Sequence, residues 1–191
     1  MTDDAPSRLP RIADPESDPL LREQFAARRA SGGRILNLHL TNAHSPALSK
    51  AQWGTISVIR TQTKPPQSLF ELAILRTAQI CECEYEVVQH IPMALRAGLT
   101  RAQIDAVAQW RGSSLFDERQ RALLAWVEAM MTNKGDVDDA TFDELARHFS
   151  PQEIVELTTT ATLYYGTGLM MKALRIRLEP ESRAAADRAG R

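Results

Sequence analysis

Four residues in the middle of the chain combine a thiol, two carboxylates and an imidazole at spacings that could form one site. Cys83, Glu86 and His90 stand at relative offsets of three and seven, and on a helix that advances about 100° per residue they share a stripe roughly 60° wide. Glu71 lies on the predicted preceding helix, and a turn between the two could bring its carboxylate to the same space. The set could support thiol chemistry or acid and base chemistry.

The thiol itself is in an unfavourable setting. A nucleophilic cysteine reacts as the thiolate, and the positions next to this thiol in sequence are Glu82, Glu84 and Glu86. A like charge at about 4 Å and an effective dielectric near 20 costs about 4 kcal/mol, whereas a helix N-terminus returns about 0.3–1 kcal/mol. We therefore expect Cys83 to be a reluctant thiolate unless those carboxylates turn outward.

Cys81 is the only other cysteine. If both cysteines lie on one helix, positions two residues apart point about 200° apart and cannot form an unstrained disulfide. We therefore expect two free thiols and no resolving partner for Cys83.

Proline, glycine and capping residues divide the middle of the chain into about seven or eight predicted helices, with no convincing strand. Ser68 with Glu71 and Thr100 with Gln103 have the spacing of capping boxes, and residues 31–44 are typical of a loop. The predicted helices cover residues 20–30, 46 to before 65, 68–80, about 87–97, 100–111, 115–134, 139–149 and 150 through 174.

The two ends differ from this helical region in composition. Residues 1–19 carry four prolines among charged residues and predict an extended arm. Residues 180–191 are charged and alanine-rich and predict a flexible tail. We expect one helical domain over residues 20–179.

The overall charge is nearly balanced, with 23 basic and 24 acidic residues. No global field that would attract nucleic acid or an anionic membrane follows from it. The start of the chain does not resemble a secretory signal, and no segment approaches the roughly 20 apolar residues of a membrane span. We expect a cytoplasmic protein with no nucleic-acid or membrane partner.

The run ELAILRTAQICECEYEVVQHIPMALRAGLT resembles the core of the carboxymuconolactone decarboxylase family, which includes alkyl hydroperoxidase D. The resemblance rests on Glu71, the CEYE segment from Cys83, His90 and the ending ALRAGLT, and extends more weakly over residues 45–170. It implies an all-α, alkyl hydroperoxidase D-like fold that assembles as trimers or hexamers, with the motif lining a pocket for a small-molecule substrate. We expect no cofactor.

The two branches of the family differ at one position of this motif. The peroxidase branch carries a glutamate, then CxxC, then a histidine, and Glu86 stands where its second cysteine would be. The decarboxylase branch commonly shows CxYE before the histidine, as Cys83, Tyr85 and Glu86 do here. The resemblance therefore favours decarboxylase-like chemistry and places Tyr85 among the residues expected to bind substrate.

Decarboxylation of a lactone acid leaves an enolate-like anion that must be stabilised and protonated. His90 would be the proton donor, and Glu71 or Glu86 would orient the imidazole or exchange protons itself. A substrate carboxylate would need a cation, for which Arg76 and Arg60 are candidates by their position in helices near the motif.

Three functions remain open. The first is a decarboxylase-like enzyme acting on a small organic acid or lactone. The second is a peroxiredoxin-like alkyl hydroperoxidase that uses Cys83 with an external reductant. The third is a non-catalytic, oligomeric binding protein.

Each residue also has a structural interpretation. Glu71 could cap its helix, Cys83 could be a small core residue, and Glu86 with His90 could be a surface pair. The cysteine spacing does not favour a zinc site, so we expect no metal. His39 and His44 could reach the pocket of a neighbouring subunit or bond locally.

Overall fold

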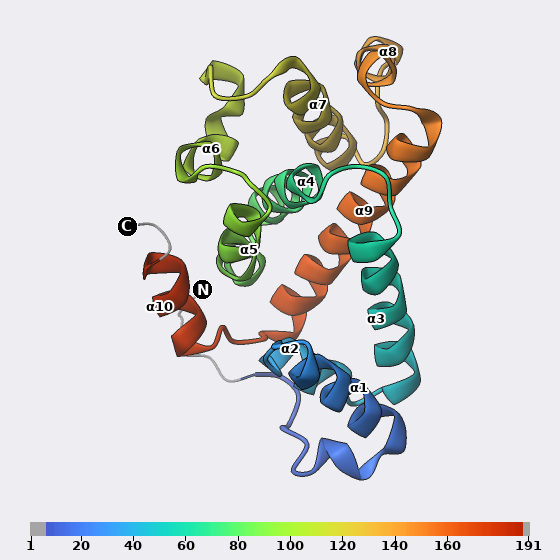
Figure 1. The fold of residues 1–191 in the computed structure, drawn as a ribbon, viewed down its shortest axis with the longest axis vertical. Helices are drawn as coiled ribbons and strands as arrows, with labels where there is room; N and C mark the ends of the chain where they lie inside the picture. The colour runs from blue at the N-terminus through green and yellow to red at the C-terminus, as the bar shows by residue number, and fades with distance from the viewer. Residues whose placement is uncertain (1–6, 189–191) are drawn as a thin grey trace. The chain divides into compact units, whose positions relative to one another are not determined.

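The computed structural model describes residues 7–188, and this part of the chain contains ten α-helices, two 3-10 helices and no strand (Figure 1). The predicted all-α class is confirmed, with more helices than the seven or eight expected. Residues 1–6 of the predicted arm and 189–191 of the predicted tail lie outside the described residues. The described residues form two compact units, 7–62 with 171–179 and 63–170 with 180–188.

The first unit is built around a small apolar core of Leu21, Phe25 and Ala43. The Asp18 carboxylate accepts hydrogen bonds from the first backbone N–H groups of α1 and so caps that helix. The backbone N–H of Arg8 donates to the carbonyl of Leu174 at 3.0 Å, which attaches this part of the N-terminal segment. The elements of this unit are η1 (Pro15–Ser17), α1 (Pro19–Ala30), α2 (Asn37–Asn42) and α3 (Pro46–Thr61).

Helix α2 occupies a segment for which the sequence predicted a loop. Its start is stabilised by the ring of His39, whose Nδ1 accepts the backbone N–H of Leu36 at 2.9 Å. Burial, with a smaller contribution from Arg28, lowers the pKa of His39 to about 3, so its ring is neutral. His44 lies 2.9 Å from the carbonyl of Pro10. Both histidines therefore make local contacts within the first unit.

In the second unit α4 is the central helix and packs against α5 and α7 (Figure 1). Residues around its whole circumference are buried, as expected of a helix that is apolar on nearly all sides. Any polar side chain on this helix must find its partner inside the protein. The elements of this unit are α4 (Gln67–Ile80), α5 (Glu84–Arg96), α6 (Arg101–Ala106), η2 (Val107–Gly112), α7 (Glu118–Thr132), α8 (Asp139–His148), α9 (Pro151–Leu174, of which Pro151–Met170 belong here) and α10 (Pro180–Arg188).

The two predicted capping boxes have different outcomes. The box at Thr100 and Gln103 is confirmed at the start of α6. The box at Ser68 and Glu71 is wrong: α4 begins one residue earlier, after Pro66, and no side chain caps it. Glu71 is thereby available for an interaction inside the protein.

The C-terminal segment also differs from the expected tail. Residues 180–188 form α10, which packs against α5. Arg183 forms an ion pair with Glu84 at 2.7 Å, and Gln89 donates a hydrogen bond to Ser182 at 3.0 Å. These polar contacts hold α10 on α5 although it has few large apolar residues.

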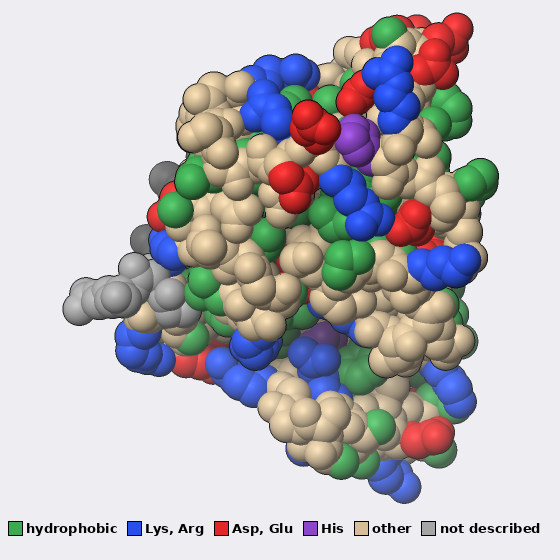
Figure 2. Space-filling model, turned by 45° about the horizontal axis from the view of Figure 1, so that its top comes forward, with side chains coloured by type: hydrophobic (Ala, Val, Ile, Leu, Met, Phe, Trp, Pro, Cys, Tyr) green, Lys and Arg blue, Asp and Glu red, His purple; other side chains and the backbone are tan. Residues whose placement is uncertain are grey.

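The face drawn in Figure 2 carries basic and acidic side chains interspersed with apolar ones, and neither sign dominates it. This distribution agrees with the nearly balanced charge of the sequence. Among residues 7–188, no helix combines the length and the apolar character that crossing a bilayer requires.

Candidate active site

His90 lies between two carboxylates in the interior of the second unit. Its Nδ1 is 2.7 Å from Oε2 of Glu71, and its Nε2 is 3.2 Å from Oε2 of Glu86. The exposed fractions of Glu71, Glu86 and His90 are 0%, 3% and 5%. Three ionisable groups are therefore removed from solvent and satisfied by one another.

The helices α4 and α5 place these groups. Glu86 and His90 are one turn apart on α5, so their side chains lie on the same face. Glu71 projects from the buried helix α4 toward that face and reaches His90 across the helix pair. The structure thus brings together three of the residues that the sequence singled out, and it excludes the surface-pair interpretation of Glu86 and His90.

The two carboxylates determine the protonation state of the imidazole. Burial lowers the pKa of His90, but the negative charge of Glu71 and the hydrogen bonds that the ring donates to Glu71 and Glu86 outweigh burial and raise it to about 9. His90 is therefore an imidazolium at neutral pH, and the cluster holds a proton between two acceptors.

The segment Cys81-Glu82-Cys83 is a tight turn and not a stretch of helix. Cys81 ends α4, Glu82 adopts left-handed backbone angles with φ of 53°, and Cys83 precedes the first residue of α5 with φ of −98° and ψ of 89°. A left-handed conformation is uncommon for a residue other than glycine. The prediction that the two thiols diverge was based on helical geometry, which this turn does not have.

Cys83 contacts the side chain of Cys81 and the backbone N–H of Glu86. A hydrogen bond with the Cys81 side chain and burial raise the pKa of Cys83, and the charge of Glu86 adds to this effect. A hydrogen bond from the backbone N–H of Glu86, in the first turn of α5, acts in the opposite direction. The resting thiol is therefore protonated, next to a backbone donor that would stabilise the thiolate.

Two residues of α9 complete the surroundings of this site, and the sequence did not identify either. The ring of Tyr164 meets the ring of His90 edge to face, with centroids 5.0 Å apart. A Cβ atom built on Gly168 would lie 2.7 Å from Sγ of Cys81 and 3.7 Å from Sγ of Cys83. A glycine inside a predicted helix is the signal that could have indicated this close approach.

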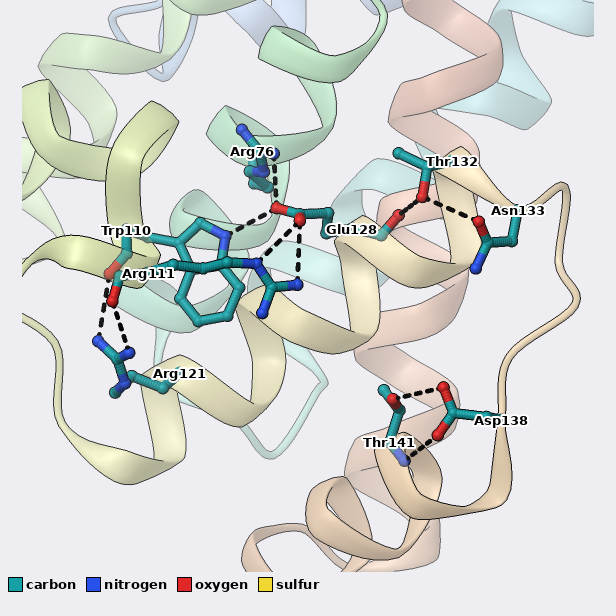
Figure 3. A network of polar contacts seen from close by, with 9 residues as sticks. All are labelled: Arg76, Trp110, Arg111, Arg121, Glu128, Thr132, Asn133, Asp138 and Thr141. Carbon is teal, nitrogen blue, oxygen red and sulfur yellow. Dashed lines mark hydrogen bonds and ion pairs between the residues drawn. The ribbon is translucent and has the colours of Figure 1, made fainter.

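The structure gives the positions of the three predicted substrate-binding residues. Arg76 pairs with Glu128 at 2.6 Å, and the same carboxylate accepts hydrogen bonds from Trp110 and Arg111 (Figure 3). Arg60 lies on α3, in the other unit. Tyr85 is buried on α5. The structure therefore gives the carboxylate cluster no contact with Arg76.

Glu128 is expected to be important for stability. Glu128→Ala leaves the guanidinium of Arg76 and the indole N–H of Trp110 without their acceptor and should lower the free energy of unfolding by about 2–4 kcal/mol. The matched control is Glu144→Ala on α8, where a more exposed glutamate pairs with Arg147 and His148; this change should cost much less than Glu128→Ala. Chemical denaturation measures both, and similar losses would contradict the role given to Glu128.

A second prediction concerns the contact of α9 with the two cysteines. Gly168→Ala places a methyl group against Sγ of Cys81 and should lower the free energy of unfolding by about 1–3 kcal/mol. Gly166→Ala, two residues away, meets nothing within 4 Å and should raise it by about 0.5–1 kcal/mol because alanine favours a helix. A stabilising Gly168→Ala would show that α9 does not approach the thiols so closely.

Groups of three or more metal-binding side chains arranged around a common point are absent from residues 7–188. The site is thus described by its protein groups: a thiol beside a second thiol, and a protonated imidazole between two carboxylates. Such groups can exchange protons with a thiol or with a small molecule bound at it.

Residues 46–129 match the model of the carboxymuconolactone decarboxylase family. This segment runs from the start of α3 into α7 and contains Glu71, Cys83, Glu86 and His90. The uncharacterized protein YnjA of Escherichia coli is 40% identical over 88 residues, which are 46% of this chain and 48% of YnjA. The chain thus matches about half the length of this relative.

Solved structures share the fold over nearly the whole chain. The debrominase Bmp8, in complex with 2,3,4-tribromopyrrole, has a TM-score of 0.76 and 23% identity, covering 96% of each chain. A peroxidase-related protein from Ralstonia eutropha, described as an alkylhydroperoxidase AhpD core, has a TM-score of 0.82 and 20% identity, covering 94% of this chain and 96% of that one. At these identities the likeness concerns the fold.

The fold and the site together define a class of protein: all-helical, with a buried thiol beside a cluster of two carboxylates and an imidazole. Residues 46–129 of the chain match the carboxymuconolactone decarboxylase family, and its fold is that of alkylhydroperoxidase AhpD-like proteins. Proteins of this fold include enzymes, of which the debrominase is one.

Proposed function

We propose that the protein is a thiol-dependent enzyme that reduces a small hydroperoxide at Cys83. The observation that carries this proposal is that Cys83 bonds to the backbone N–H of Glu86, whose carboxylate contacts His90, which in turn contacts Glu71. A protonated thiol needs a base before it can attack, and its leaving group needs an acid. The buried cluster supplies both next to the thiol.

Each group has a distinct role in the proposed reaction. Glu86 accepts the thiol proton, since the charge of its carboxylate acts on Cys83 and its backbone N–H donates to the sulfur. The positive charge of His90 lowers the cost of placing a thiolate near two carboxylates. Glu71 keeps the imidazole protonated and fixes its orientation through the bond to Nδ1.

The first chemical step balances without a further reactant. The thiolate sulfur of Cys83 attacks one peroxide oxygen, the O–O bond breaks, and the leaving alkoxide or hydroxide takes the proton that Glu86 had received. The sulfur is oxidised to a sulfenic acid and the peroxide is reduced to an alcohol or water. Because Cys83 is only 2% exposed, the substrate must be small.

Two structural relatives carry descriptions that support this kind of chemistry. One is described as peroxidase-related with an alkylhydroperoxidase AhpD core. The tribromopyrrole complex of the debrominase was obtained with a cysteine replaced by alanine. A peroxidase-related protein and a debrominase studied with a replaced cysteine therefore support thiol chemistry as a proposal for this chain.

Acid and base chemistry on a lactone acid has less support in this geometry. Both imidazole nitrogens of His90 are engaged by carboxylates, and a second anionic group brought to the cluster would be repelled. Arg76, expected to bind the substrate carboxylate, is engaged with Glu128. A neutral peroxide avoids both difficulties.

Consumption of hydrogen peroxide and of a small alkyl hydroperoxide by the full chain, with dithiothreitol as reductant, tests the proposal. We expect many turnovers per protein molecule at a rate proportional to protein concentration. In parallel, a carboxylated lactone should release no carbon dioxide. Absence of peroxide turnover, or release of carbon dioxide from the lactone, would overturn the proposal.

We also propose that the protein is a homo-oligomer, a trimer or hexamer as its superfamily resemblance implies. Exposed large apolar residues such as Leu48 and Val58 on α3 support a subunit contact on that helix. Light scattering during size-exclusion chromatography should give three or six times the mass of 21.3 kDa. A mass of one chain would contradict it.

A further inference from the structure

The turn between α4 and α5 sets the two cysteines at a separation that a disulfide can bridge. Glu82 has the dihedral angles of a left-handed helix, the mirror image of an ordinary α-helix. The Cα atoms of its neighbours Cys81 and Cys83 are therefore about 5.4 Å apart, the distance between residues i and i+2 of an α-helix. Disulfides join Cα atoms that are about 4.4–6.8 Å apart. Backbone spacing therefore permits a bond between Cys81 and Cys83.

The side chains also point toward the same place. A Cβ atom on Gly168 would meet Sγ of Cys81 at 2.7 Å and Sγ of Cys83 at 3.7 Å, so both sulfurs border this one glycine. A hydrogen bond joins the two cysteine side chains. Two thiols in contact need only a small rotation about their side-chain bonds to form a disulfide.

The two thiols have different surroundings. Cys83 receives the backbone N–H of Glu86 and lies beside the carboxylate cluster. The thiol of Cys81 donates to the carbonyl of Ala78 at 3.5 Å, at the end of α4. The backbone donor at Cys83 opposes the effects that raise the pKa of this thiol, whereas the thiol of Cys81 has a carbonyl acceptor. The first attack on a substrate is therefore expected at Cys83.

We propose that Cys81 is the resolving cysteine of this site and forms a reversible intramolecular disulfide with Cys83. The proposal rests on the proposed function, because a hydroperoxide is the oxidant that converts Cys83 to a sulfenic acid. The sulfur of Cys81 then attacks the sulfur of Cys83, the S–O bond breaks, and the hydroxide leaves as water with the thiol proton of Cys81. In total, the two thiols lose two electrons, and one hydroperoxide is reduced to an alcohol and water.

A dithiol reductant completes the cycle. Its thiolate attacks one sulfur of the disulfide, the second thiol of the reductant displaces the resulting mixed disulfide, and both cysteines return to thiols. The second sulfur of the disulfide then comes from Cys81. The position that Glu86 occupies in the motif therefore needs no cysteine. Glu86 is instead available for proton transfer.

The test counts thiols in the full-length wild-type chain. The reduced protein is treated without oxygen either with one equivalent of hydrogen peroxide or with diamide, a thiol oxidant that is not a peroxide. It is then denatured, alkylated and analysed by intact mass and by non-reducing electrophoresis. We expect both treatments to leave no alkylatable thiol, to lower the mass by two hydrogen atoms and to produce no disulfide-linked dimer.

The peroxide treatment is repeated with Cys81→Ser in the presence of dimedone, which traps sulfenic acids. We expect an adduct on Cys83 in this variant and little in the wild type, since Cys81 removes the sulfenic acid in the latter. If the wild type instead accumulates the Cys83 adduct while Cys81 stays alkylatable, the resolving role is overturned and the peroxide reaction stands.

The diamide arm separates the two proposals. If diamide forms the disulfide between Cys81 and Cys83 but peroxide does not, the disulfide is upheld and hydroperoxide is overturned as the substrate. Two free thiols after diamide would overturn the disulfide, whatever the result with peroxide. Because the wild-type chain gives both readouts, the test does not depend on the folding of a variant.

Discussion

Cys83→Ser is expected to lower hydroperoxide turnover by at least about 1000-fold. The thiolate is the nucleophile in the proposed reaction, and a serine hydroxyl at the same place is neither sufficiently acidic nor able to accept the peroxide oxygen. A loss of this size corresponds to about 4 kcal/mol of transition-state stabilisation. Steady-state peroxide consumption, with a far-ultraviolet circular dichroism spectrum to verify the helices, measures it.

The matched control for this variant is Cys81→Ser. It keeps the nucleophile and removes only the second sulfur, so a first stoichiometric reaction with peroxide should remain while repeated turnover slows. If Cys83→Ser retains the wild-type rate and Cys81→Ser loses it, the nucleophile has been assigned to the wrong cysteine. Equal rates in both variants and the wild type would exclude thiol chemistry from the reaction.

The second large effect concerns stability at alkaline pH. The pKa of His90 is about 9 in the folded protein and about 6.5 in an unfolded chain. Because the folded state binds this proton more tightly, the stabilisation is fully present below about pH 6.5 and is lost as pH rises through about 9. The free energy of unfolding should fall by about 3 kcal/mol across this interval.

Urea denaturation at intervals from pH 7 to pH 10 measures this loss, and His90→Gln is the comparison. The variant should be less stable than the wild type at pH 7, because Glu71 remains buried without its cationic partner, and its stability should change much less with pH. His39, whose pKa is lowered to about 3, affects stability only below about pH 6.5 and does not interfere. A wild-type curve that is flat from pH 7 to pH 10 would contradict the protonated state of His90.

Much of the helical architecture could be predicted from local signals. Pro46 and Pro151 stand at the first positions of α3 and α9, and Gly98 follows the end of α5. These residues act within one helical turn, so their effect can be recognised without knowing the rest of the fold. Helix α2 was missed because its start is stabilised by a histidine ring, a partner that capping patterns do not include.

The candidate site was partly predictable for the same reason. Glu86 and His90 share a helix face by their spacing alone. Glu71 could be placed on the preceding helix, but its bond to His90 depends on how α4 packs against α5, and the capping role suggested by Ser68 competed with it. Spacing identifies residues that can meet, whereas packing decides whether they do.

The remaining features of the site depend on backbone conformation and on contacts between distant segments, which the spacing of residues in the sequence does not reveal. Glu82 adopts left-handed angles, which residue type alone would not suggest, and this single conformation changes the relation of the two thiols. Gly168 approaches them from more than 80 positions further along the chain. Arg76 pairs with Glu128, a partly buried carboxylate that also accepts a hydrogen bond from Trp110.

The central claim is that Glu86 takes the proton from Cys83. The oxidation rate of Cys83 by hydrogen peroxide in a single turnover at pH 7, compared between wild type and Glu86→Gln, tests it most directly, with the exposed Glu84→Gln on the same helix as control. With Glu86 as the base, Glu86→Gln should slow this reaction by about 100-fold, and Glu84→Gln should leave it nearly unchanged. An equal or faster reaction in Glu86→Gln would show that this carboxylate only opposes the thiolate by its charge, and would contradict the mechanism.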